Sequence, residues 1–239
     1  FLDRTYHGAA GIAAGEQALD VLAHAPATAR HLSLKLAQHF VADDPPPALV
    51  ARMAERFEQS QGDIRATLET LFFSAEFWDE RYYGAKFKTP GDYVISAARL
   101  SGVNDITNYR PLLGAMAMMG MAPYRHETPD GYADTREAWL NPDAMMMRLS
   151  FAAALGQGHL PLLAPPFETA AVDAGTSKGN GGSAMMRRAA LANMEPLDSA
   201  ALEAALGDSL STNTRKAIEA APAQLRAALV LGSPELMVR

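Results

Sequence analysis

The stretch from Thr89 to Leu100, TPGDYVISAARL, contains the pattern that decides the fold. A threonine, which can cap a helix, is followed by a proline, whose missing N–H costs nothing in a first helical turn. Apolar side chains then recur at spacings of three and four residues, as on one face of an α-helix. Gly102 comes just after the last of them, at a position where helices commonly end. The stretch therefore predicts an amphipathic helix with a defined beginning and end.

The same kind of pattern recurs along most of the chain. Further apolar runs of helical spacing begin at prolines or capping residues, and no run shows a convincing β-strand alternation. Alanine, the best helix former, is abundant. The sequence therefore predicts an all-α fold, a compact non-bundle array of many short helices with long loops.

Residues 161–183 interrupt this pattern with glycine, proline and serine. Within them the run 178–182, KGNGG, has the most flexible composition in the chain. We therefore expect a main helical domain at residues 1–160 and a flexible linker or loop at 161–183. Short C-terminal helices at 184–239 are expected to pack on the main domain.

The composition excludes several classes of protein. The chain has 239 residues with 21 Lys and Arg against 27 Asp and Glu, a net charge of −6, and the two signs are interspersed. A nucleic-acid-binding protein needs a basic face, so we expect no nucleic-acid partner. No apolar run approaches the roughly 18 residues of a membrane span. Because cysteine is absent, disulfides, thiolate nucleophiles and Cys-ligated metal sites are excluded.

The densest group of chemistry-bearing side chains lies in residues 128–141. Its carboxylates are weak candidates for an acid–base pair, and its two aromatic rings could stack on a sugar. Clustered oxygens also suit Ca²⁺, although the spacing is not that of an EF-hand, and no other cofactor is expected. The alternative is structural: a turn, a capping residue and a buried indole. The catalytic candidates are Asp130, Asp134 and Glu137, and the ligand-binding candidates are Tyr132 and Trp139.

Lys86 and Lys88 directly precede the helix expected at 89–100 and are further ligand-binding candidates. Together with the free N–H groups of a helix N-terminus, two cations could hold a phosphate, a sulfate or a carboxylate. Alternatively, the lysines are solvated or pair with carboxylates of the chain. A buried pairing with Asp130 or Asp134 would combine the two candidate regions.

Two methionine clusters, at 116–121 and 145–147, could supply thioether ligands to copper. Both clusters fall on expected helices, where methionine fills irregular gaps in a core, and we favour that interpretation. The histidines lack the i, i+4 spacing of a helical zinc pair, so no metal site is predicted. Trp78 and Trp139 each lie beside an expected helix start, and we expect both to be largely buried.

Six runs occur in order along the chain: FVADDPP at 40–46, SAEFW at 74–78, KFKTP at 86–90, TPDGY at 128–132, AWLNP at 138–142 and LGSPEL at 231–236. Together they resemble a bacterial family known as "domain of unknown function 1800". The similarity covers nearly the whole chain and corresponds to the C-terminal portion of the family. Since members are typically longer at the N-terminus, we expect this chain to be part of a longer protein.

The resemblance implies a location and partners. Members of the family are often exported, and their genes commonly lie beside genes for an exported sulfatase-like family. This implies a periplasmic or secreted protein that acts with a sulfatase-like partner and with the missing N-terminal part of its own chain. We expect a binding or assembly module, and whether it is an enzyme stays open. The alternative is a hydrolase that acts on a glycan or a sulfated polymer through the carboxylates of residues 128–141.

Overall fold

The computed structural model describes residues 11–163 and 194–239, and most of these residues lie in helices. Within these two ranges there is no β-strand, and one isolated antiparallel bridge joins Phe87 to Val238. The predicted all-α fold is confirmed. None of the helices described is both long and apolar enough to cross a lipid bilayer.

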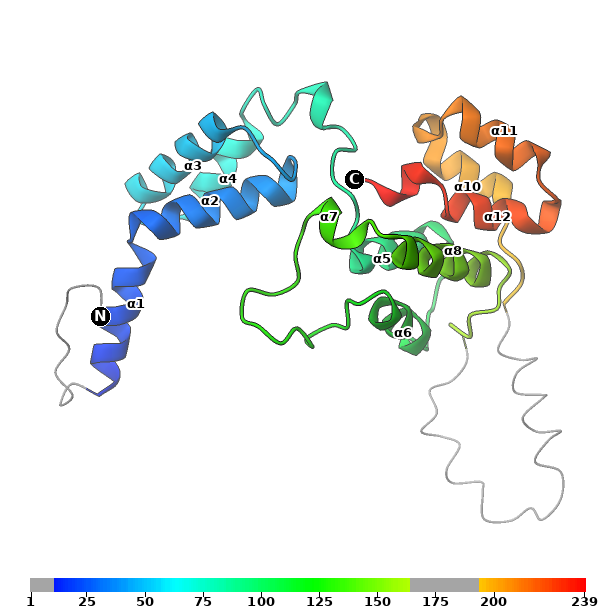
Figure 1. The fold of residues 1–239 in the computed structure, drawn as a ribbon, viewed down its shortest axis with the longest axis horizontal. Helices are drawn as coiled ribbons and strands as arrows, with labels where there is room; N and C mark the ends of the chain where they lie inside the picture. The colour runs from blue at the N-terminus through cyan, green and yellow to red at the C-terminus, as the bar shows by residue number, and fades with distance from the viewer. Residues whose placement is uncertain (1–10, 164–193) are drawn as a thin grey trace, which may run out of the picture. The chain divides into compact units, whose positions relative to one another are not determined.

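The helices are short, and several of them begin at a proline or at a capping side chain (Figure 1). The α-helices are α1 (Ile12–Ala23), α2 (Pro26–Phe40), α3 (Pro47–Gln59), α4 (Ile64–Phe72), α5 (Pro90–Leu100), α6 (Arg110–Met118), α7 (Arg136–Trp139), α8 (Pro142–Gly156), α10 (Ser199–Leu206), α11 (Thr212–Ala220) and α12 (Ala223–Leu231). Short 3₁₀ helices are η2 (Glu80–Tyr82), η5 (Gly207–Ser209) and η6 (Pro234–Met237).

The chain divides into two compact units, residues 1–86 and 87–239, and each has a core of its own. We call them unit 1 and unit 2. The boundary falls just before α5, at a position where no sequence pattern predicted one. The linker expected at 161–183 lies almost wholly outside the described residues, so the domain division based on it stays a prediction.

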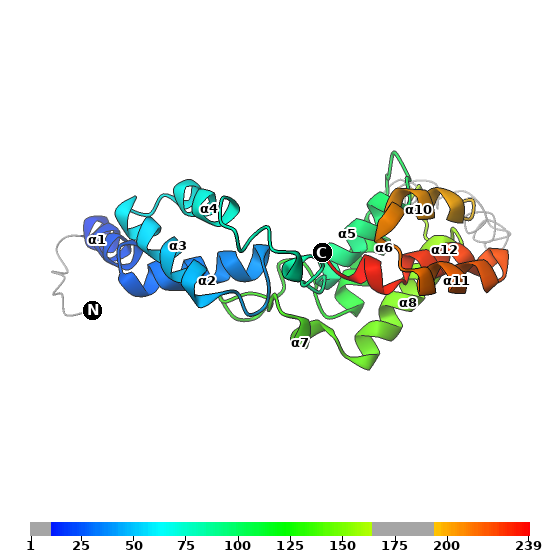
Figure 2. The same ribbon diagram turned by 90° about the horizontal axis from the view of Figure 1, so that it is seen from above.

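Unit 1 is built around α2 and α3, which lie side by side in both views (Figures 1 and 2). Their shared core contains Ala37, Leu49 and Met53, all fully buried. The next helix, α4, is capped by Asp63, whose carboxylate accepts hydrogen bonds from the N–H groups of two residues in the first turn at 2.8 and 3.2 Å. This side-chain cap fixes where α4 starts and so where its apolar face meets α3.

Unit 2 has the larger core, to which α5, α8 and α12 contribute Tyr93, Leu155 and Leu231. Helices α8 and α12 approach very closely at Gly156, where a Cβ atom would lie 2.9 Å from the backbone nitrogen of Ala228. Only glycine allows this approach without a shift of the backbone. The C-terminal residues then run beside the start of α5, and this brings the end of the chain to the region predicted as a site.

Candidate functional site

The N-terminus of α5 is fully capped. The Asp92 N–H donates to Oγ1 of Thr89 at 3.2 Å, and the Thr89 N–H donates to the Asp92 carboxylate at 3.3 Å. The Gly91 N–H points at the sulfur of Met121, 3.4 Å away. Because these groups are bonded, the anion site predicted just before this helix lacks the N–H donors on which it depended.

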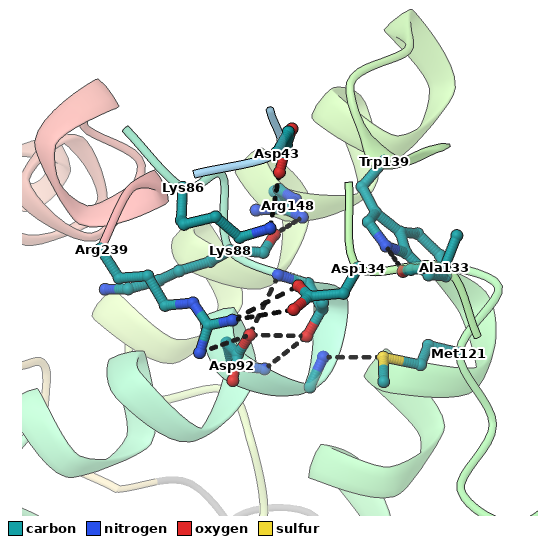
Figure 3. A network of polar contacts seen from close by, with 12 residues as sticks. Asp43, Lys86, Lys88, Asp92, Met121, Ala133, Asp134, Trp139, Arg148 and Arg239 are labelled. Carbon is teal, nitrogen blue, oxygen red and sulfur yellow. Dashed lines mark hydrogen bonds and ion pairs between the residues drawn. The ribbon is translucent and has the colours of Figure 1, made fainter. Parts of the chain in front are cut away.

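Lys86 lies at the end of unit 1, where its side chain is buried. Its Nζ is 2.5 Å from Oδ1 of Asp43, a residue of the acidic turn after α2 (Figure 3). A buried ammonium needs such a partner, because an uncompensated charge away from water is strongly destabilising. Lys86 therefore makes a structural ion pair within unit 1.

Lys88 belongs to unit 2, and both of its backbone groups are bonded. Its N–H donates to the carbonyl of Met237 at 2.8 Å, and its carbonyl accepts from Nη2 of Arg148 at 2.6 Å. Burial lowers the pKa of the Lys88 ammonium. Asp92 opposes this shift, whereas Arg239 and Arg148 add to it. The ammonium thus lies in a crowded, positively charged region at the start of α5.

Among the described residues of unit 2, Arg148 of α8 is the most deeply buried charge, and no pattern in the sequence indicated its importance. Its guanidinium carbon lies 4.4 Å from the ring centroid of Phe87 and 5.0 Å from that of Tyr93. Among the described residues, its Nε and Nη1 have no hydrogen-bond partner. Burial lowers the pKa of Arg148 to about 10. Two aromatic faces and one carbonyl, rather than a carboxylate, surround this cation.

Arg239 connects the tail to two acidic residues of unit 2 (Figure 3). Its Nη2 lies 3.3 Å from each carboxylate oxygen of Asp134, and its Nη1 lies 3.8 Å from the carboxylate of Asp92. Asp134 was a catalytic candidate, and the structure gives it a partner that the sequence did not suggest. This contact ties the tail to the loop before α7.

The other two catalytic candidates lie in and after the loop that precedes α7. The Asp130 carboxylate accepts the hydroxyl of Thr128, and this bond closes the turn at the loop's tip. Glu137 lies in the first turn of α7 and is exposed. No group of three His, Asp or Glu residues gathers as a metal site in the described part of the chain.

The two aromatic candidates hold this loop in place. Trp139 is 8% exposed, and its indole N–H donates to the Ala133 carbonyl at 2.7 Å. The Tyr132 hydroxyl donates to the Ala122 carbonyl at 2.8 Å, and the two ring centroids are 6.1 Å apart. The predicted burial of Trp139 is confirmed. Its ring has no exposed face on which a sugar could stack.

The prediction that Trp78 is buried is wrong. Its side chain, just after α4 in unit 1, is 63% exposed. The indole N–H donates to the Phe72 carbonyl, so the ring is tied to the helix end while its surface faces solvent. The capping pattern located the turn correctly, but it could not show on which side of that turn the ring lies.

Exposed apolar side chains on and beside α6 of unit 2 were not predicted from the sequence. From Pro111 to Pro123 no side chain is polar. Met116 and Met119 lie in the core, as the gap-filling interpretation predicted, whereas Met118 is 68% exposed. Tyr109, Leu113 and Tyr124, in and beside α6, are exposed as well, and we refer to these three residues and Met118 together as the α6 surface. The absence of polar side chains from residues 111–123 could have predicted this exposure, because an amphipathic surface helix has polar residues on its outer side.

These features define an all-helical protein of two compact units, in which many predicted site residues stabilise loops and the tail. A family model described as "Protein of unknown function (DUF1800)" matches residues 1–238, and the chain belongs to this family. No curated protein and no solved structure matches the chain.

Proposed function

We propose that this protein is an exported binding or assembly module, and that its α6 surface binds a sulfatase-like protein partner. The partner and the location come from the family resemblance. What supports a binding role is the chemistry of α6, in which every residue after Arg110 is apolar or glycine and Leu113 and Met118 are exposed. Exposed methionine and tyrosine side chains of this kind are enriched where proteins meet.

Tyr124 adds a second indication at the same surface. It is fully exposed and has a φ of 60°, a backbone conformation that is unusual for a bulky residue. Such a conformation costs about 1–3 kcal/mol and is concentrated at functional sites. A strained tyrosine that projects into solvent contributes nothing to the core, so a role in contact with a partner accounts for it best.

A hydrolase that uses the acidic loop has less support from the geometry. Asp134 is held by Arg239, Asp130 accepts a hydroxyl within its own turn, and Glu137 lies on the exposed side of α7. A general acid and base need a shared space for a substrate. The positions of these three carboxylates favour binding over catalysis.

The test measures association of the full-length protein with the purified sulfatase-like protein encoded beside it. The expected result is a complex at micromolar concentrations. Leu113→Asp and Met118→Asp should each weaken it by about tenfold or more, because each places a charge in an apolar contact. Isothermal titration calorimetry gives the dissociation constants directly.

A matched control separates the α6 surface from apolar surface in general. Leu225 on α12 is 40% exposed, close to the 47% of Leu113, and Leu225→Asp should leave the affinity unchanged. Unfolding curves of all three variants exclude loss of fold as the cause. If the two proteins do not associate at about 10 μM, or if the α6 variants bind like the wild type, the proposal is wrong.

A further inference from the structure

Trp78 is the most exposed large ring of unit 1 that is also firmly held. Its indole N–H donates to the Phe72 carbonyl at 2.8 Å. The Phe77 ring meets it edge to face, with centroids 5.2 Å apart and an interplanar angle of 89°. Phe77 in turn contacts Phe72 in the same way at 5.1 Å. The indole is therefore fixed in orientation while 63% of its side chain remains in contact with solvent.

The turn that carries the ring is rigid for a local reason. The Ser74 hydroxyl donates to the Leu71 carbonyl at 2.7 Å and accepts the Phe77 N–H at 3.2 Å. This cap closes the chain directly after α4 and fixes the backbone that leads into Trp78. A ligand that binds a fixed ring loses little affinity to ordering of the side chain.

Two fixed carboxylates border the ring in the sequence. Glu76 accepts two hydrogen bonds of 2.8 Å from one terminal nitrogen of Arg52. Asp79 accepts three bonds, of 2.6 to 3.0 Å, from the guanidinium of Arg81. The Arg81 contact lowers the pKa of Asp79 to about 2, and the Arg52 contact lowers the pKa of Glu76. Both carboxylates are therefore ionised acceptors at neutral pH.

An exposed, fixed indole close in the chain to two ionised carboxylates suits a carbohydrate better than a protein partner. Glu76 and Asp79 lie within two residues of Trp78 in the chain, so a protein partner large enough to cover the ring would also cover their ion pairs. Desolvation of such charges is costly. A carbohydrate leaves such pairs hydrated, and its hydroxyl groups can replace water as donors to the carboxylates. Its flat C–H face can also lie against an aromatic ring, whose face is electron-rich.

We propose that Trp78, with Glu76 and Asp79 on either side of it in the chain, forms a carbohydrate-binding site of unit 1. The ligand class is a neutral glycan of β-1,4-linked pyranose units, in which equatorial substituents leave a flat C–H face for the indole. This site is separate from the α6 surface of unit 2 and does not depend on the function proposed for it.

The test titrates cellohexaose and chitohexaose separately into the full chain and follows binding by calorimetry. The expected result is saturable binding of at least one of them, with a blue shift of tryptophan fluorescence as the exposed indole is covered. Trp78→Ala should weaken binding by about tenfold or more, and Trp78→Tyr, which keeps an aromatic face, should weaken it less. Glu76→Gln, which removes charge but keeps an acceptor oxygen, should retain measurable binding.

Tyr83 provides the matched control, since it is an exposed aromatic residue of unit 1 outside the stacked rings. Tyr83→Ala should leave glycan binding unchanged. The proposal is overturned if neither hexasaccharide binds at concentrations up to about 10 mM, or if Trp78→Ala binds as tightly as the wild type. It is also overturned if Trp78→Ala abolishes capture of the protein partner but no glycan binds, because the ring then belongs to a protein contact.

Discussion

Each tryptophan of the chain donates its indole N–H to a backbone carbonyl six residues earlier, Trp78 to Phe72 and Trp139 to Ala133. The two bonds are nearly identical in length, at 2.8 and 2.7 Å. Nevertheless, Trp78 is 63% exposed and Trp139 is 8% exposed. The local hydrogen bond therefore does not determine whether the ring is buried or exposed.

Long-range packing accounts for the difference. Trp139 belongs to the core of unit 2, where its ring lies 3.9 Å from the position of a Cβ atom on Gly120, and where Tyr132 packs beside it. The ring contacts of Trp78 come from Phe77, its neighbour in the chain. Local sequence thus determines how each ring is tied to the backbone, whereas distant residues determine whether the ring is buried.

The largest expected effect is that of Trp139→Ala. Removal of a buried indole leaves a cavity in the core of unit 2, so the free energy of unfolding should fall by about 3–5 kcal/mol. Urea denaturation followed by circular dichroism measures this loss. A loss below about 1 kcal/mol would mean that Trp139 lies at the surface in solution, and the contrast with Trp78 would disappear.

A smaller loss of stability is expected for Trp139→Phe. This substitution removes the indole N–H but keeps most of the apolar side chain, so it measures the contribution of the hydrogen bond apart from that of the packing. The phenyl ring fills most of the space, but the bond to the Ala133 carbonyl is lost and the smaller ring leaves a small void. The loss should be about 1–2 kcal/mol in the same denaturation experiment. A loss as large as that of Trp139→Ala would show that the hydrogen bond, rather than the packing, holds the loop before α7.

The helix starts could be predicted from sequence because their chemistry is local. Thr89 and Pro90 begin α5 as expected, and Asn141 accepts the N–H of Ala144 at the start of α8. The contacts of the candidate site are not local. Asp43 meets Lys86 across 43 positions of the chain, and neither residue type nor spacing indicates that pair.

Arg148 is the clearest case of a contact that the sequence could not predict. It is the only charged residue of α8 after the first turn, and such a residue on an apolar helix would normally face water. In the structure it packs against Phe87 and Tyr93, which precede it by more than fifty positions. Its burial follows from the packing of α8 against the start of α5, and no pattern within α8 itself contains that information.

The smallest effect on stability is expected for Trp78→Ala. Because most of the ring is already in water, its removal should cost less than about 1 kcal/mol, from the lost contact with Phe77 and the freed carbonyl of Phe72. Acrylamide quenching of fluorescence compares the exposure of the two tryptophans directly, because the chain contains no others.

Trp78→Phe should remove the readily quenched part of the emission and leave the protected part, which comes from Trp139. Equal quenching of both residues, or a stability loss from Trp78→Ala near that of Trp139→Ala, would mean that Trp78 is also a core residue, and its ring would then have no free face for a glycan.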